Sequence, residues 1–183
     1  SLAPAGDLVQ LRRIGRRPGL AAVVFALLTV SGTVALGSTL VMDAGAAISN
    51  SANTSGLSVA GTSTLAGAIT TAGSQSYTGA VTLGAATTLT TLNSSSANTN
   101  AAVAFGSTVD GAYALTITNG SGNVSFGATV GASAPLASLT VTGGASATAQ
   151  TTTLAGNVTT SGNQTYGGAL TMGSNTALTS TAN

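Results

Sequence analysis

Two stretches of the chain have similar sequences: QSYTGAVTLGAATTLT at residues 75–90 and QTYGGALTMGSNTALT at residues 164–179. Extended to residues 65–90 and 154–179, the two copies share 15 identical positions out of 26, and we call them the two copies of the long repeat. Self-similarity at a fixed offset is typical of repeat architectures, in which one unit is too thin to bury its apolar face alone. The long repeat therefore predicts a stack of similar units.

A shorter period lies inside this unit. VAFGSTV at 103–109 is matched by VSFGATV at 124–130. In four places an aromatic residue is followed by Val or Leu four positions on, and these aromatic residues are Tyr77, Phe105, Phe126 and Tyr166. Alternating runs such as ALTIT (114–118) and SLTVT (138–142) lie between the motifs and predict strands with one apolar face.

Short strands separated by turn sequences such as NGSGN (119–123) indicate how the units are built. They predict an all-β parallel β-helix, or β-solenoid, over residues 47–183, with about 20 residues per coil. Neighbouring coils in such a stack lie about 4.8 Å apart, so like side chains stand above one another. Thr, Asn and Val suit these ladders, whereas like charges would repel. An antiparallel meander or sandwich is the alternative architecture.

The composition agrees with ordered β-structure and excludes several classes of protein. The chain has no Lys, Glu, His, Cys or Trp, and beyond residue 43 its only charged residue is Asp110. Thr and Val are abundant and Pro is scarce, which favours strands over disorder. Without Cys there is no disulfide framework. Nucleic-acid binding needs cationic side chains to neutralise phosphates, and none follows Arg17.

Residues 1–46 have a different character and predict an export segment. The basic cluster QLRRIGRR (10–17) precedes a run without charge that reaches Asp43 and is most apolar at Leu20–Val30. This order predicts a hydrophobic signal helix, with cleavage near Ala46. The alternative is a retained anchor, because residues 19–42 are long enough to span a bilayer.

The repeat text resembles the β-strand-repeat regions of large bacterial surface proteins, the filamentous-haemagglutinin-like and autotransporter-type adhesins. The resemblance covers about residues 57–183, and FGSTVDGAYALT (105–116) and the QTYGGAL-type phrases carry it. It implies a right-handed parallel β-helix that is exported through an outer-membrane transporter and displayed or released. It implies no catalytic residues. Because LTSTAN at 178–183 parallels the start of LTTLNSSSAN at 89–98 and stops in mid-repeat, we expect the chain to be a fragment of a longer repeat array.

The sequence offers little chemistry. Proton-transfer catalysis draws on His, Glu, Asp, Lys, Tyr or Cys, and after residue 43 only Asp110 and three Tyr remain. Ser has no His or Lys to activate it, and carboxylates are too few for a metal site. We therefore expect no enzyme, catalytic residue, cofactor or metal, and read Asp110 in VDGAY as a turn residue. Tyr77, Phe105, Phe126 and Tyr166 are the candidate binding residues, either as an aromatic strip that stacks on sugars or as an internal packing stack.

The resemblance and the export segment together imply a non-enzymatic protein of the bacterial cell surface, secreted or attached to the outer membrane. The expected role is the stalk of an adhesin that mediates attachment or aggregation. The expected partners are host-cell or bacterial surface molecules, with glycans among them. One alternative is a structural surface-layer or matrix protein. Another is an ice- or crystal-binding solenoid, because Thr-x-Thr recurs along the chain, although at irregular spacing. A third is a periplasmic protein anchored in the inner membrane through residues 20–41.

Overall fold

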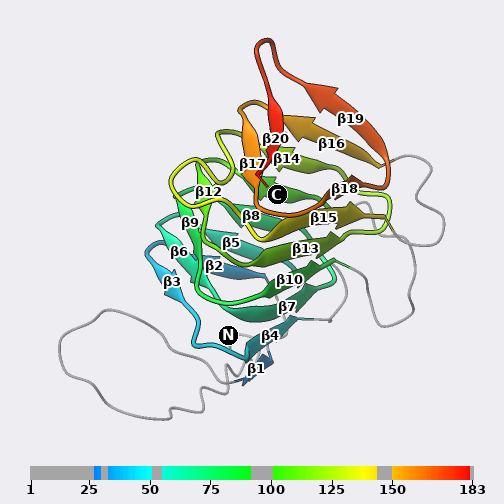
Figure 1. Cartoon of the computed structure of the whole chain (residues 1–183). Helices are drawn as coiled ribbons and strands as arrows, with labels where there is room; N and C mark the ends of the chain where they lie inside the picture. The colour runs from blue at the N-terminus through cyan, green and yellow to red at the C-terminus, as the bar shows by residue number, and fades with distance from the viewer. Residues whose placement is uncertain (1–26, 30–32, 51–54, 92–100, 144–149, 182–183) are drawn as a thin grey trace, which may run out of the picture.

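Three parallel sheets make up the fold in a computed structural model that describes residues 27–29, 33–50, 55–91, 101–143 and 150–181. Figure 1 shows them as three stacks of short strands around one interior. Strands follow the chain from the first sheet to the second, to the third, and back to the first. Because the chain makes this circuit repeatedly, the described residues form a β-solenoid.

The strand bounds follow the three sheets. The first sheet contains β1 (Leu27–Thr29), β4 (Ala46–Asn50), β7 (Gly67–Thr71), β10 (Thr87–Thr90), β13 (Ala114–Thr118), β15 (Ser138–Thr142) and β18 (Gln164–Tyr166). The second contains β2 (Val34–Leu36), β5 (Leu57–Val59), β8 (Gln75–Tyr77), β11 (Val103–Phe105), β14 (Val124–Phe126), β16 (Thr151–Leu154) and β19 (Ala169–Met172). The third contains β3 (Leu40–Val41), β6 (Ser63–Leu65), β9 (Val81–Leu83) and β12 (Val109–Asp110), then β17 (Val158–Thr160) and β20 (Leu178–Ser180).

Pairing confirms the predicted parallel arrangement. Every strand pair within the described ranges is parallel, and each joins neighbouring coils. Bridges from Val130 to Val109 and to Val158 join the two parts of the third sheet. The antiparallel meander or sandwich is therefore excluded for these residues, and no helix occurs among them.

Alternation along each strand places columns of buried, mainly apolar side chains on the inner side of each sheet, and one column of each sheet runs through most of its strands. The first sheet contributes Ile48, Ile69, Leu89, Ile117 and Val141. The second contributes Val59, Tyr77, Phe105, Phe126 and Leu154. The third contributes Leu40, Val81, Val109, Val130 and Val158, with the buried polar Ser63 in register between Leu40 and Val81. The apolar members of these columns are buried and form one hydrophobic core. Each such side chain stabilises the fold by about 1.5–3 kcal/mol through its removal from water.

Coil length varies along the stack. In the second sheet, Leu57 pairs with Gln75 and Val103 pairs with Val124, and both steps span coils close to the predicted length. The step from Gln75 to its partner Val103 spans a longer coil. The longest coils have their additional residues between β10 and β11 and between β15 and β16, where the chain passes from the first sheet to the second. The strands therefore keep their register across coils of different length.

The two copies of the long repeat occupy different faces. In the first copy, β7, β8 and β9 lie in the first, second and third sheets. Their counterparts β17, β18 and β19 lie in the third, first and second sheets. The second copy is therefore rotated by one face, because the interval between the copies does not contain a whole number of coils.

The N-terminal export segment falls largely on residues that lie outside the described ranges. The predicted signal helix, with its apolar centre at Leu20–Val30, is described only at Leu27–Thr29, which form β1. β2 and β3, inside the predicted segment 1–46, pair with β5 and β6 of the solenoid. Across the described ranges, no helix has the length and apolar character needed to cross a membrane. Cleavage near Ala46 stays a prediction.

Candidate functional site

Charged groups are sparse over the part of the chain that the structure describes. No group of three or more His, Cys, Asp or Glu side chains comes together there to hold a metal ion. Asp110 lies at the end of β12, and its Oδ1 accepts hydrogen bonds from the backbone N–H groups of Ser133 (2.8 Å) and Ala134 (3.3 Å). Gly111 follows with a φ of 125°, which glycine adopts readily. Asp110 thus ends a strand at a turn, as predicted, and also holds the loop of the next coil.

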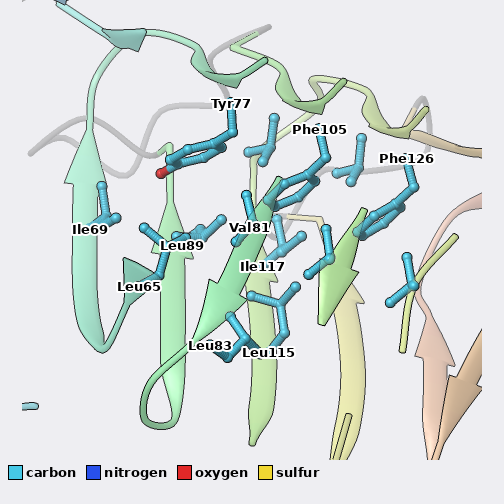
Figure 2. Close-up of a cluster of buried hydrophobic side chains, with 14 of the residues drawn as sticks. Leu65, Ile69, Tyr77, Val81, Leu83, Leu89, Phe105, Leu115, Ile117 and Phe126 are labelled. Carbon is cyan, nitrogen blue, oxygen red and sulfur yellow. The ribbon is translucent and has the colours of Figure 1, made fainter. Parts of the chain in front are cut away.

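Three of the four candidate aromatic residues form an internal stack. Tyr77, Phe105 and Phe126 are 0–1% exposed. The ring centroids of Tyr77 and Phe105 are 5.3 Å apart, and those of Phe105 and Phe126 are 5.0 Å apart, with nearly parallel planes. Figure 2 shows the three rings in a row above the aliphatic core. Because the rings are inside the coil, they cannot stack on a sugar in solvent, and the packing interpretation describes them.

The fourth aromatic residue lies elsewhere. Tyr166 is in β18 of the first sheet and pairs with Val141, so it continues the aliphatic column and not the aromatic stack. The prediction of one four-membered strip is wrong in this respect, because the second repeat copy is rotated by one face. Burial raises the pKa of the Tyr77 phenol well above 10.0 and raises the pKa of Tyr166 to about 12.

The aromatic-to-Val spacing marks a corner of the coil. Tyr77 points inward from the second sheet, and Val81, four positions on, points inward from the third sheet. Gly79 lies between them, where a Cβ atom would collide with the carbonyl oxygen of Gly61 in the preceding coil. A Cβ atom at Gly168 would likewise collide with the carbonyl oxygen of Gln150 in the preceding coil. A residue without a side chain is therefore needed for the backbones of two coils to approach at these corners.

A buried glutamine joins two coils at the first copy of the repeat. The Gln75 Nε2 donates to the Thr90 carbonyl oxygen of the next coil at 3.0 Å, to the Ile69 carbonyl oxygen at 3.3 Å and to Thr71 Oγ1 at 3.2 Å. Its Oε1 accepts a hydrogen bond from the Tyr77 hydroxyl at 3.0 Å. The amide therefore satisfies the polar end of a fully buried tyrosine and ties successive coils together. We call this arrangement the glutamine clamp.

The second copy builds the same clamp on another corner. The Gln164 Nε2 donates to the Thr179 and Val158 carbonyl oxygens at 2.9 and 3.4 Å, and to Thr160 Oγ1 at 3.2 Å. The Tyr166 hydroxyl donates to Gln164 Oε1 at 3.2 Å. Sequence reasoning did not single out either glutamine. Their presence in both copies, between a Gly and a Tyr that the copies share, was the signal that could have found them.

The outer side of the first sheet carries two columns of threonine in register, which we call the Thr array. One column is Thr88, Thr116, Thr140 and Thr165, and the other is Thr70, Thr90, Thr118 and Thr142. All eight side chains are exposed or half-buried. Oγ1 of Thr142 lies 3.5 Å from Oγ1 of Thr118 and donates to the carbonyl oxygen of Ile117 at 3.4 Å. Thr118 and Thr142 of the array are therefore linked across neighbouring coils.

The other two sheets present different outer surfaces. Along the second sheet, Ser58, Ser76, Ala104, Ser125 and Thr153 form one mixed column. Along the third, Thr64 and Thr82 are followed by Asp110. The first sheet thus has the only double Thr column among the described residues.

No protein-family model matches the chain, and no significant similarity to a curated protein or to a solved structure is found. The residues and the geometry described above are therefore the basis for any functional interpretation.

Proposed function

We propose that the chain is the stalk of a bacterial adhesin, a non-enzymatic rod that is secreted or displayed at the cell surface. The observation that supports this role most directly is the unbroken parallel stack with one continuous core. Such a stack gains length by adding coils, and each coil needs only its neighbours for stability. A long rigid extension from a cell surface requires this property.

The proposal includes a right-handed winding and a basic coil of about 20 residues. Parallel strand–crossover–strand connections are right-handed in about 98% of cases in sheet proteins, which favours that hand here. The register partners Leu57 with Gln75 and Val103 with Val124 support the coil length, and the longer coils carry insertions at corners. The export signal at the N-terminus and passage through an outer-membrane transporter belong to the same proposal.

The proposed partners are surface molecules of host cells or of other bacteria, including glycans. A direct test compares a strain that lacks the parent gene with the wild type and with the complemented deletion strain. We expect the deletion to reduce attachment to host cells or aggregation between bacteria, and complementation to restore it. Antibodies against the solenoid should bind intact wild-type cells. Unchanged attachment and aggregation in the deletion strain would remove the adhesin role.

A further inference from the structure

We infer that the Thr array on the first sheet binds the surface of ice. This inference concerns one face of the rod and does not depend on the adhesin role. It uses three properties of that face: regular spacing in two directions, absence of charge, and side chains that each present a methyl group and a hydroxyl group.

The spacing follows from β-geometry. Thr116 and Thr118 lie two residues apart on β13, which corresponds to about 6.6 Å in a parallel strand. Thr116 pairs with Thr140 on the neighbouring coil, which corresponds to about 4.8 Å. Repetition of these two steps produces a two-dimensional array of Thr side chains, each of which carries one hydroxyl and one methyl group. Only a target with its own two-dimensional order can contact all of them equivalently, and the surface of a crystal has such order.

The Thr-x-Thr pairs are irregularly spaced along the sequence, which argued against ice binding. The structure shows that the pairs of β10, β13 and β15 are nevertheless aligned in space. The stretch of chain from Thr88 to Thr116 is longer than the stretch from Thr116 to Thr140, yet each pair is directly opposed across neighbouring strands. In the sequence, the additional residues of the longer coil come between β10 and β11 and so do not interrupt either strand. The array is therefore regular in space although it is irregular along the chain.

The chemistry of the face fits ordered water. Charged side chains orient water around themselves, and no strand of the first sheet contains one. A Thr methyl group restricts the orientations of the water beside it, while its hydroxyl can hydrogen-bond to that water. The contact between Thr118 and Thr142 restricts the freedom of these hydroxyl groups, which lowers the entropy lost when they engage a rigid surface.

Two other occupants fit the face less well. A crystalline polysaccharide would be expected to use platforms of several aromatic rings, but Tyr77, Phe105 and Phe126 are buried, and the exposed Tyr113 is a single ring that precedes β13. A second copy of the chain would cover the hydroxyl groups of the array, which would then need partners that a second Thr surface supplies only in one alignment. Water molecules both donate and accept hydrogen bonds, so an ice surface aligned with the array can supply a partner to each hydroxyl.

The test measures thermal hysteresis, the gap between the melting and freezing points of a single ice crystal, with the whole chain. We expect a gap and faceted ice crystals for the wild type. Thr116→Lys places a charged chain in the centre of the array and should abolish the gap. Thr153→Lys introduces the same side chain on the second sheet and is the matched control, which should keep the gap. Circular dichroism and melting curves verify that both variants fold.

A milder pair of variants keeps the test decisive if a lysine disturbs folding. Thr116→Ser and Thr140→Ser each remove one methyl group and should reduce the gap, because the hydroxyl alone does not order the adjacent water. The inference is overturned if the wild type shows neither a gap nor shaping of ice crystals. It is equally overturned if the array variants match the control. If the wild type is a dimer that Thr116→Lys dissociates, the face is an interface between copies and not an ice-binding surface.

Discussion

The two copies of the long repeat, residues 65–90 and 154–179, build the same local structure under different burial. The clamp amide donates to a carbonyl oxygen of the following coil at 3.0 Å in the first copy and at 2.9 Å in the second. The tyrosine hydroxyl donates to the glutamine at 3.0 and 3.2 Å. Gln75 and Tyr77 are fully buried, whereas Gln164 and Tyr166 are half-buried. The clamp therefore depends on its own sequence, whichever face it occupies.

Burial depends on the following coil. Tyr77 is covered by Phe105 of the next coil, while among the described residues no further coil covers β18, β19 or β20. Met172 and Leu178 are accordingly 48% and 42% exposed, although they continue inward columns. The similar sequences thus form the same hydrogen bonds in both copies. Their contributions to the free energy of unfolding differ, because the two copies are buried to different extents.

The largest expected effect is truncation of the stacked tyrosine. Tyr77→Ala should destabilise the fold by about 3–5 kcal/mol, because it leaves a cavity in a closed core and removes a ring from the stack. Tyr166→Ala should cost clearly less, because its ring is already partly exposed. Guanidinium denaturation followed by circular dichroism measures both. Equal losses would show that position in the stack does not determine the contribution.

The next effect is removal of the clamp amide. Gln75→Leu keeps the approximate volume of the side chain but leaves the Thr90 carbonyl oxygen and the Tyr77 hydroxyl without these partners, which should cost about 2–3 kcal/mol. In Gln164→Leu, water can reach the corresponding groups, so a smaller loss is expected. Hydrogen exchange of the backbone amides near each clamp reports the local change. A greater loss for Gln164→Leu would contradict the comparison.

Glycine substitutions should affect both copies alike, because they concern the preceding coil and not the following one. Gly79→Ala and Gly168→Ala each force a methyl group against a carbonyl oxygen of the preceding coil, with an expected cost of about 2 kcal/mol. Gly173→Ala is the control, since its Cβ would lie 3.5 Å from the Leu154 carbonyl oxygen, at ordinary contact distance. Thermal melting of the three variants provides the measurement. A cost at only one of the two corners would break the equivalence of the copies.

The smallest expected effect is the loss of folding stability at alkaline pH, where Tyr77 and Tyr166 ionise; at neutral pH there is no such loss. Burial raises the folded-state pKa of both tyrosines above 10.0, so folding favours the neutral phenol. The resulting stability is complete below pH 10 and is lost as pH rises, for Tyr166 through the interval from 10 to about 12. Ultraviolet titration of phenolate should lose a step near pH 12 in Tyr166→Phe. Ionisation of Tyr77 in the folded protein at its ordinary pKa would contradict its burial.

The parallel stack could be predicted because strand alternation and repetition are visible in short stretches of the amino-acid sequence. The runs at 114–118 and 138–142 became β13 and β15, and Tyr77, Phe105 and Phe126 were correctly recognised as equivalent. The expectation that Tyr166 belongs to the same column was wrong. The sheet on which a repeat copy lies depends on the length of every coil before it, which the local pattern does not reveal. The recurring Thr-x-Thr pairs were noticed in the sequence, but their alignment into one array was not predicted, since only the folded register shows which threonines are opposed.

Rotation by one face between repeat copies has a consequence for any longer array built from the same unit. Corresponding residues of successive copies would then lie on the three faces of the solenoid in turn. A molecule that binds the repeat could therefore reach a copy from any side of such a filament, and a filament lying against a surface would still expose some copies on its free faces.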